Sequence, residues 1–216
     1  MSTLAKTLTL KKTATFYDRI ADVHNFALKL NGYRDSVAKF LKSLDLDVGP
    51  DSVVLDAGSG TGIVTLAFHQ AGFRPAKTVA FDLSGNSLQL AMEQAAKEKF
   101  ADSDNIVAVQ GNILKMPFAD ESFDVILSCG VLEYVPLEEG MSELARVLKP
   151  EGRLLLMPVK PSIVGSLLEL LYNFKIHPPE NVRRTARKYF NIVGEPEFPI
   201  AEPISWSKAI FLLEKA

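Results

Sequence analysis

The sequence predicts an α/β protein built on a doubly wound, mostly parallel sheet. Short and almost wholly apolar segments alternate with helical patterns from residue 52 onward, and several of these segments end at an acidic or glycine-containing loop. Strands without polar positions are typical of a parallel sheet that helices cover on both faces. Right-handed crossovers between such strands give a doubly wound arrangement.

The order of elements follows from this pattern. Apolar runs predict five strands, at 53–55, 78–81, 106–109, 125–127 and 154–157. Apolar residues spaced by three and four predict helices over 63–71, 88–95 and 141–148, and the last of these is expected to end at the turn formed by 149–152. Two final strands, 192–193 and 209–213, are joined by a proline-containing loop without a helix, which favours an antiparallel hairpin at the edge of the sheet.

Two helices are expected before the sheet. Phe16, Ile20, Val23, Ala27 and Leu30 recur at helical spacing, and a second apolar stripe follows within 37–44. We expect residues 1–50 to form a helical cap that belongs to the same domain as the core, 51–216. A strongly apolar segment within 160–180, after the fifth strand, is expected to form a substrate lid, with packing on the domain body as the alternative.

Composition limits the class of partner. The chain has 216 residues, 47% of them hydrophobic and 23% charged, with a formal net charge of −2. The charge argues against nucleic-acid binding, and the only cysteine, Cys129, excludes an internal disulfide and favours a reducing, cytoplasmic location. No apolar run reaches the roughly 20 residues needed to cross a bilayer. Contact with a membrane surface stays open but is not expected, and the sequence does not indicate an oligomeric state.

A glycine-rich loop follows the first strand. Residues 56–62 read Asp-Ala-Gly-Ser-Gly-Thr-Gly, and such a loop lies beyond the carboxyl end of a parallel strand, where open α/β sheets bind ligands. The dinucleotide fingerprint is G-x-G-x-x-G, whereas the spacing here is G-x-G-x-G. Asp56 would repel a pyrophosphate but suits a ligand that carries an ammonium group and no phosphate, such as S-adenosylmethionine.

A second carboxylate, Asp82, ends the second strand. It can accept hydrogen bonds from both hydroxyls of a ribose, each contributing on the order of 1.5–3 kcal/mol. Ser84 is the better candidate to cap the following helix, which leaves Asp82 available for a ligand. Asp82 does not by itself separate the two cofactors, because dinucleotide enzymes use an acid at the same place.

The chain resembles the class I S-adenosylmethionine-dependent methyltransferases, and in particular those that act on small molecules and lipid quinones. Five segments in the family's order carry the resemblance across roughly residues 50–157: VVLDAGSGTG (53–62), FDLS (81–84), GN with MPF (111–118), FDVILS (123–128) and LARVLKPEGRLLL (144–156). The resemblance implies a Rossmann-like sheet of seven strands, the last of them antiparallel. It also implies S-adenosylmethionine as cofactor, with S-adenosylhomocysteine as product.

The resemblance assigns roles to particular residues. The glycine turn would lie along the methionine part of the cofactor, Asp82 would hold the ribose, Leu83 would pack on the adenine, and Asn112 would meet the adenine amino group where relatives often have Asp. Tyr17, in a Tyr-Asp pair typical of the small-molecule branch, could offer an aromatic face to the sulfonium, as could Tyr33. The full set of expected cofactor-binding residues is Tyr17, Asp56, Ala57, Gly58, Ser59, Gly60, Gly62, Asp82, Leu83, Asn112, Ile113, Ser128 and Cys129.

No catalytic residue is identified. Relatives often carry Leu-Glu-His-Val where this chain has Leu132-Glu133-Tyr134-Val135, so the obvious histidine base is replaced by Tyr134. The three histidines, His24, His69 and His177, do not form a cluster with metal-ligand spacing, and a nucleophilic Cys129 is a minor alternative. We therefore expect a methyltransferase that acts on a small, apolar or amphiphilic acceptor by in-line displacement. The alternatives are a non-catalytic S-adenosylmethionine-binding module and an NAD(P)-dependent oxidoreductase.

Overall fold

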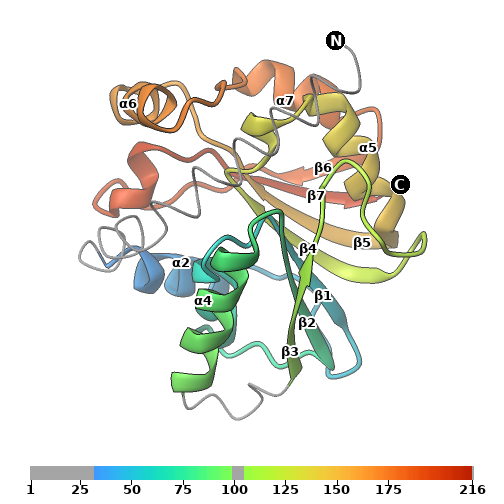
Figure 1. The fold of residues 1–216 in the computed structure, drawn as a ribbon. Coiled ribbons are helices and arrows are strands. Elements are labelled where there is room, and N and C mark those ends of the chain that lie inside the picture. The colour runs from blue at the N-terminus through green and yellow to red at the C-terminus, as the bar shows by residue number, and fades with distance from the viewer. Residues whose placement is uncertain (1–31, 99–104, 216) are drawn as a thin grey trace.

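The computed structural model describes residues 32–98 and 105–215. The first expected helix and Tyr17 lie outside these residues. One seven-stranded sheet forms the centre of the molecule (Figure 1), in the order β3-β2-β1-β4-β5-β7-β6. The strands are β1 (Val53–Ala57), β2 (Lys77–Asp82), β3 (Ile106–Gln110), β4 (Phe123–Cys129), β5 (Leu148–Met157), β6 (Phe190–Gly194) and β7 (Phe211–Lys215).

The sheet confirms the predicted fold class. β1 to β5 are parallel to one another, whereas β7 pairs antiparallel with both β5 and β6. The terminal hairpin of β6 and β7 therefore lies at the edge of the sheet as predicted. β7 lies between β5 and β6, and β6 is the edge strand. The order reverses at β1, where β2 and β4 flank the strand that leads into the glycine loop.

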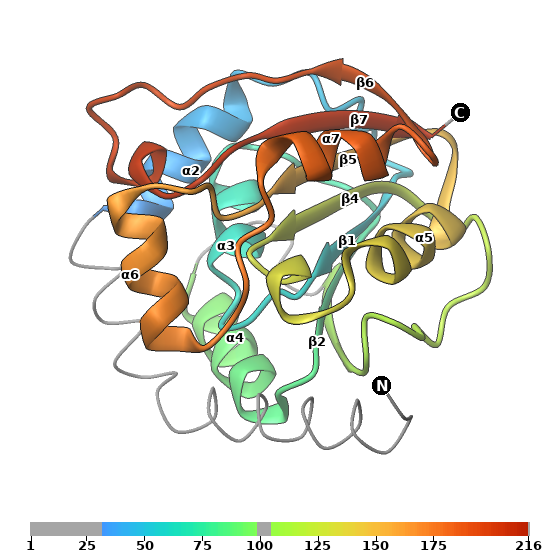
Figure 2. The same cartoon turned by 90° about the horizontal axis from the view of Figure 1, so that it is seen from above.

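Helices cover both faces of the sheet. On one face, α2 (Tyr33–Lys42) and α3 (Ile63–Gln70) pack against alternate residues of β1 and β4, and α4 (Gly85–Lys97) packs on β2 and β3. On the other face lie α5 (Leu137–Val147) and α7 (Pro179–Ala186). A further helix, α6 (Ile163–Tyr172), lies at the periphery of the sheet (Figure 2). None of the helices in the described part of the chain is long and apolar enough to span a membrane.

The predicted turn at 149–152 forms inside a strand. α5 ends at Val147, but β5 starts at once and pairs with β4 at Leu148, and pairing resumes only at Arg153. The intervening residues form a bulge in which Glu151 has a φ of 61°. The predicted helix end is therefore correct to a residue, whereas the strand predicted to start at 154 starts six residues earlier.

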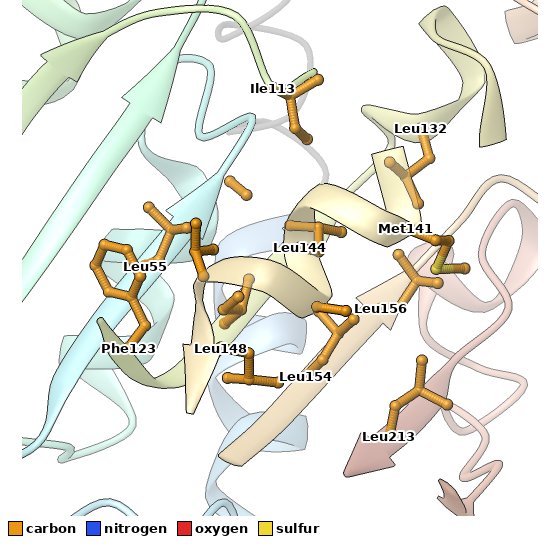
Figure 3. Packing of buried hydrophobic residues seen from close by; sticks show 14 of the residues in the cluster. Leu55, Ile113, Phe123, Leu132, Met141, Leu144, Leu148, Leu154, Leu156 and Leu213 are labelled. Carbon is orange, nitrogen blue, oxygen red and sulfur yellow. The ribbon is translucent and has the colours of Figure 1, made fainter. Parts of the chain in front are cut away.

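Two clusters of buried side chains hold the layers together. The larger lies between the sheet, α5 and α7 (Figure 3) and includes Leu55, Met141, Leu144, Leu154 and Leu213. The other lies under α2 and α3. The larger cluster continues into the loops that follow β3 and β4, through Ile113 and Leu132, so these loops are packed on a rigid base.

A substitution at Phe68 tests how much the second cluster contributes to the free energy of unfolding. Its side chain is 0% exposed and its ring stacks on Phe73, with centroids 4.6 Å apart. We expect Phe68→Ala to lower the free energy of unfolding by about 3–5 kcal/mol, because it removes a buried ring and leaves a cavity. Urea denaturation followed by circular dichroism measures this change. Ile200→Ala, at an exposed position, is the matched control and should change stability by less than about 0.5 kcal/mol.

Candidate functional site

The glycine turn after β1 is held against the end of β2. The backbone N–H groups of Gly58 and Ser59 both donate to the carbonyl oxygen of Phe81, at 2.8 and 3.0 Å. Gly58 has a φ of +77°, and a Cβ atom at this position would lie 2.5 Å from the Cβ of Val131. A side chain is therefore excluded at residue 58 by both conformation and space.

The Asp82 carboxylate joins the loops that follow β1 and β2. Its Oδ2 accepts a hydrogen bond from the Gly60 N–H at 2.8 Å, and its Oδ1 accepts one from the Ser84 N–H at 2.9 Å. Ser84 caps α4 as predicted, since its hydroxyl accepts from the Ser87 N–H at 3.1 Å. Asp82 thus remains at the edge of the loops and is not used as a helix cap.

These loops border a cavity of about 260 Å³ beyond the carboxyl ends of the strands. One half is lined by the glycine turn and by the ends of β2 and β3. The other half is lined by the segment after β4, by α6 and by the residues before β7. The residues that line the second half are Gly130, Val131, Tyr134, Val135, Val159, Leu168, Tyr172, Phe174, Ser207 and Lys208.

The structure brings most of the expected cofactor-binding residues together. Those that line the cavity are Gly58, Ser59, Gly60, Asp82, Leu83, Asn112, Ile113 and Cys129. Asp56, Ala57, Gly62 and Ser128 lie behind the cavity wall. Gly62 is instead a packing residue, because a Cβ there would lie 2.8 Å from the Cβ of Ala91 on α4.

Asp56 is buried and bonded to the first helix after the loop. Its Oδ2 accepts from the backbone N–H and the hydroxyl of Thr65, at 2.9 and 2.6 Å, whereas its Oδ1 makes no hydrogen bond within the described residues. Burial raises the pKa of Asp56 to about 7, the Thr65 hydrogen bonds oppose that shift, and the charge of Asp82 adds to it.

Tyr33, at the start of α2, brings an aromatic ring into the cavity. Its hydroxyl lies 3.8 Å from the Cys129 Sγ, at the end of β4. Burial, and then the neighbouring Cys129, raises the pKa of Tyr33 well above its ordinary value. The phenol is therefore neutral at physiological pH and can donate a hydrogen bond.

The segment expected to form a lid contributes apolar and aromatic side chains to the cavity. The Tyr134 and Phe174 rings meet edge to face with centroids 5.3 Å apart, and α6 contributes Leu168 and Tyr172. Lys208 comes from the loop before β7, where no motif marks it. Most other large apolar side chains of α6 are exposed, Ile163 and Leu170 by 93% and 81%, and Gly165 is its only fully buried residue.

The histidines of the described chain do not face the cavity. His69 is fully buried and contacts the Thr78 hydroxyl at 3.0 Å, while His177 Nε2 lies 3.2 Å from the Leu132 carbonyl oxygen. Among residues 32–98 and 105–215, no three His, Cys, Asp or Glu side chains are grouped so that they could hold a metal ion. Basic residues in and just after α7 have partners on the surface: Arg183 pairs with Glu195, Arg184 donates to Asn181, and Lys188 pairs with Glu138.

A seven-stranded sheet of this order, with a glycine turn and an acid at the first two strand ends, defines a methyltransferase domain of the S-adenosylmethionine-dependent type. Residues 55–156 match the protein-family model of the methyltransferase domain. Residues 55–156 thus form a methyltransferase domain, and the chain is similar to the class I S-adenosylmethionine-dependent methyltransferases, whose cofactor is S-adenosylmethionine.

Relatives and solved structures agree with this assignment. The chain is 31% identical over 147 residues to the ubiquinone/menaquinone biosynthesis C-methyltransferase UbiE of Rhizobium rhizogenes, a match that covers 68% of this chain and 55% of that protein. It is 28% identical to a demethylmenaquinone methyltransferase of Shouchella clausii, covering 84% of this chain and 76% of the relative. The chain thus spans little more than half the length of the first relative.

A solved structure shares the fold. Geranyl diphosphate C-methyltransferase from Streptomyces coelicolor A3(2), in complex with Mg²⁺, geranyl diphosphate and S-adenosyl-L-homocysteine, has a TM-score of 0.67 and 19% sequence identity. The match covers 83% of this chain and 78% of that structure.

The residues present fit the cofactor. A Cβ at Gly60 would meet no atom within 4 Å, so the turn is open on the cavity side. The Ser59 hydroxyl is buried and makes no hydrogen bond within the described chain. An open turn, an available hydroxyl and the Asp82 carboxylate suit a ligand with amino-acid and ribose groups, and no basic residue of the turn is present to hold a pyrophosphate.

Asp56 makes stability depend on pH. Because the pKa of Asp56 in the folded protein is about 7 and in the unfolded chain near its ordinary 3.8, the folded state retains a proton that the unfolded state has lost between these values. Stability is therefore expected to fall as pH rises from 4 to 7, by about 4 kcal/mol from this group. Urea denaturation at pH 5, 6 and 7.5 should give a flatter profile for Asp56→Asn, and an unchanged one for the exposed control Asp51→Asn. A slope in Asp56→Asn equal to that of the wild type would contradict the assignment.

Proposed function

We propose that the protein transfers a methyl group from S-adenosylmethionine to a small-molecule acceptor. The observation that carries the proposal is that the glycine turn, Asp82 and Asn112 border one end of a cavity whose other end is lined by apolar and aromatic side chains. Two chemically different halves joined at the end of β4 suit a cofactor in one half and an acceptor in the other.

The polar half supplies the groups that the cofactor requires. Asp82 Oδ2 accepts from the Gly60 N–H and Oδ1 from the Ser84 N–H, and these bonds hold the carboxylate in place at the cavity, where it can accept hydrogen bonds from the ribose hydroxyls. Leu83 and Ile113 offer apolar surface to the adenine. The side-chain oxygen of Asn112 accepts from the Leu114 N–H at 2.9 Å, so the Asn112 amide is held in place beside it. Asp56 lies behind the turn, where its hydrogen bonds to Thr65 join the end of β1 to α3. Its unbonded Oδ1 favours a positively charged group of the cofactor nearby.

The apolar half indicates the kind of acceptor. Leu168, Tyr172 and Phe174 come from α6 and the residues just after it, so we assign α6 as the substrate lid expected within 160–180. The cap expected of residues 1–50 stays a prediction. The names of the relatives, which refer to ubiquinone and menaquinone biosynthesis, support an apolar or amphiphilic acceptor for this chain. The cytoplasmic location expected from the sequence stays a prediction.

Catalysis in this site rests on orientation. The bound cofactor supplies an activated methyl group on a sulfonium, and the protein has to hold the acceptor in line with it. Positioning of this kind can account for several kcal/mol of the barrier. The neutral Tyr33 hydroxyl beside Cys129 and the rings of Tyr134 and Phe174 fix the walls at the junction of the two halves. A non-catalytic role and a dinucleotide oxidoreductase are not favoured.

Cofactor binding tests the polar half. We expect Asp82→Asn to weaken S-adenosylhomocysteine binding by on the order of tenfold or more, because a neutral amide replaces the charged acceptor of two ribose hydroxyls. Isothermal titration calorimetry measures the dissociation constant, and Asp51→Asn serves as the control. Equal affinity of Asp82→Asn and wild type would rule out the proposed ribose site, provided that circular dichroism shows both proteins folded.

Turnover tests the reaction. With S-adenosylmethionine and a panel of quinols, phenols and short isoprenoids, we expect S-adenosylhomocysteine to accumulate only when an acceptor is present, as measured by mass spectrometry. Leu168→Asp, in the apolar half, should abolish this release while leaving cofactor affinity within about twofold. Cofactor binding without transfer to any acceptor of the panel would favour a non-catalytic module.

A further inference from the structure

Lys208 places a positive charge at the junction of the two halves of the cavity. In the sequence it lies between η3 (Pro203–Trp206) and β7. Its backbone forms an isolated β-bridge with Val159, which follows the end of β5. Its side chain lines the cavity, and a Cβ built on Gly130 would lie 2.6 Å from the Lys208 Nζ. The ammonium group therefore packs directly over Gly130, one residue beyond the end of β4.

Within residues 32–98 and 105–215, no direct ion pair neutralises this charge. The ion pairs among the described residues join acidic groups to other lysines and arginines, and none of them includes Lys208. Glu133 is buried in the same region, where its Oε1 accepts a hydrogen bond from the Val159 N–H and its Oε2 makes no hydrogen bond within the described residues, and it forms no ion pair with Lys208 there. A partly buried ammonium without a paired carboxylate favours the binding of an anion.

The surroundings of Lys208 are apolar. Val159, Tyr134, Leu168 and Phe174 line the same half of the cavity. A ligand that fits this half thus has one anionic end at Lys208 and an apolar body against α6. The charge at Lys208 lies away from Asp82, the acid of the polar half, since the two residues come from opposite sides of β1 in the sheet order.

We propose that Lys208 binds an anionic oxygen of the acceptor, so that the substrate is an amphiphile with an acidic oxygen head and an apolar body. This inference rests on the proposed function and specifies its substrate class. An acceptor held in this way presents its head beside Gly130 and its body to Leu168 and Tyr172 of α6. Lys208 is thereby a substrate-binding residue that fixes the acceptor's orientation.

Matched amphiphiles test the proposal with the protein loaded with S-adenosylhomocysteine. Sodium decanoate and decyl phosphate carry a carboxylate and a phosphate head, and 1-decanol is the neutral analogue of the same chain length. Isothermal titration calorimetry measures the dissociation constant of each amphiphile. We expect the wild type to prefer at least one of the two anions over decanol by roughly tenfold or more, as a hydrogen bond to a charged group predicts. Preference for decanoate assigns a carboxylate-like head, and preference for decyl phosphate a phosphate head.

Variants separate the lysine's role from the fold and from the cofactor. Lys208→Met should lose the preference, Lys208→Arg should retain most of it, and Lys160→Met, a nearby lysine outside the cavity, should behave as the wild type. All three should bind S-adenosylhomocysteine within about twofold of the wild type by calorimetry.

Three results would overturn the inference. The first is equal binding of anions and decanol by the wild type, or no binding of any amphiphile. The second is an unchanged preference in Lys208→Met. The third is a tenfold loss of S-adenosylhomocysteine affinity in Lys208→Met, which would show that Lys208 binds the cofactor carboxylate instead. Failure of the wild type to bind S-adenosylhomocysteine at all would instead overturn the proposed function.

Discussion

The hydrogen bonds that tie the loop after β1 to the end of β2 are the constraint on which the site depends. The Gly60 N–H reaches the Asp82 carboxylate, and the N–H groups of Gly58 and Ser59 reach the Phe81 carbonyl oxygen. Because the two strands are neighbours in a parallel sheet, their carboxyl ends meet, and the loop closes over a buried base. The two backbone donors hold the Asp82 carboxylate at the cavity, so the same bonds organise the turn and fix the proposed ribose acceptor.

The fold could be predicted because its signals are local. Each strand from β1 to β4 is a short apolar run, and each ends where the sequence places a polar or glycine residue. The start of β5 could not be predicted in this way, since the residues 149–152 have turn chemistry. The structure accommodates both the turn and the strand by placing the turn in a bulge of β5. Glycine is required at residue 152 there, because a Cβ would lie 2.9 Å from the Asp124 carbonyl oxygen. The position of β7 inside the terminal hairpin depends on tertiary pairing with β5, which no local pattern reports.

The same reasoning explains which parts of the site were found. Gly58, Gly60 and Asp82 belong to contiguous motifs at strand ends, and the structure places them around one cavity. Asp56 belongs to the same motif but lies behind the cavity, bonded to Thr65, because a residue that is still within the strand points into the packed layer below the loop. Leu168 comes from the apolar segment expected to form a lid, whereas Lys208 comes from a segment without any motif. They reach the cavity only because η3 and α6 fold over the carboxyl ends of β4 and β5, and that approach is a property of the whole fold.

The chemistry of the acceptor half follows from what stands at the end of β4. The family resemblance implies a histidine in many relatives where this chain has Tyr134, and among the described residues no histidine lines the cavity. A neutral acceptor that must lose a proton would therefore lack an imidazole base here. An acceptor whose oxygen is already ionised needs no such base, and an ammonium group beside that oxygen lowers its pKa and so favours the ionised form. Attack by an anion on a sulfonium also removes two opposite charges in one step, which an apolar cavity favours because it solvates separated charges poorly. The replacement of histidine by tyrosine and the presence of Lys208 over Gly130 thus have one common explanation, which is an acceptor that enters the site as an anion.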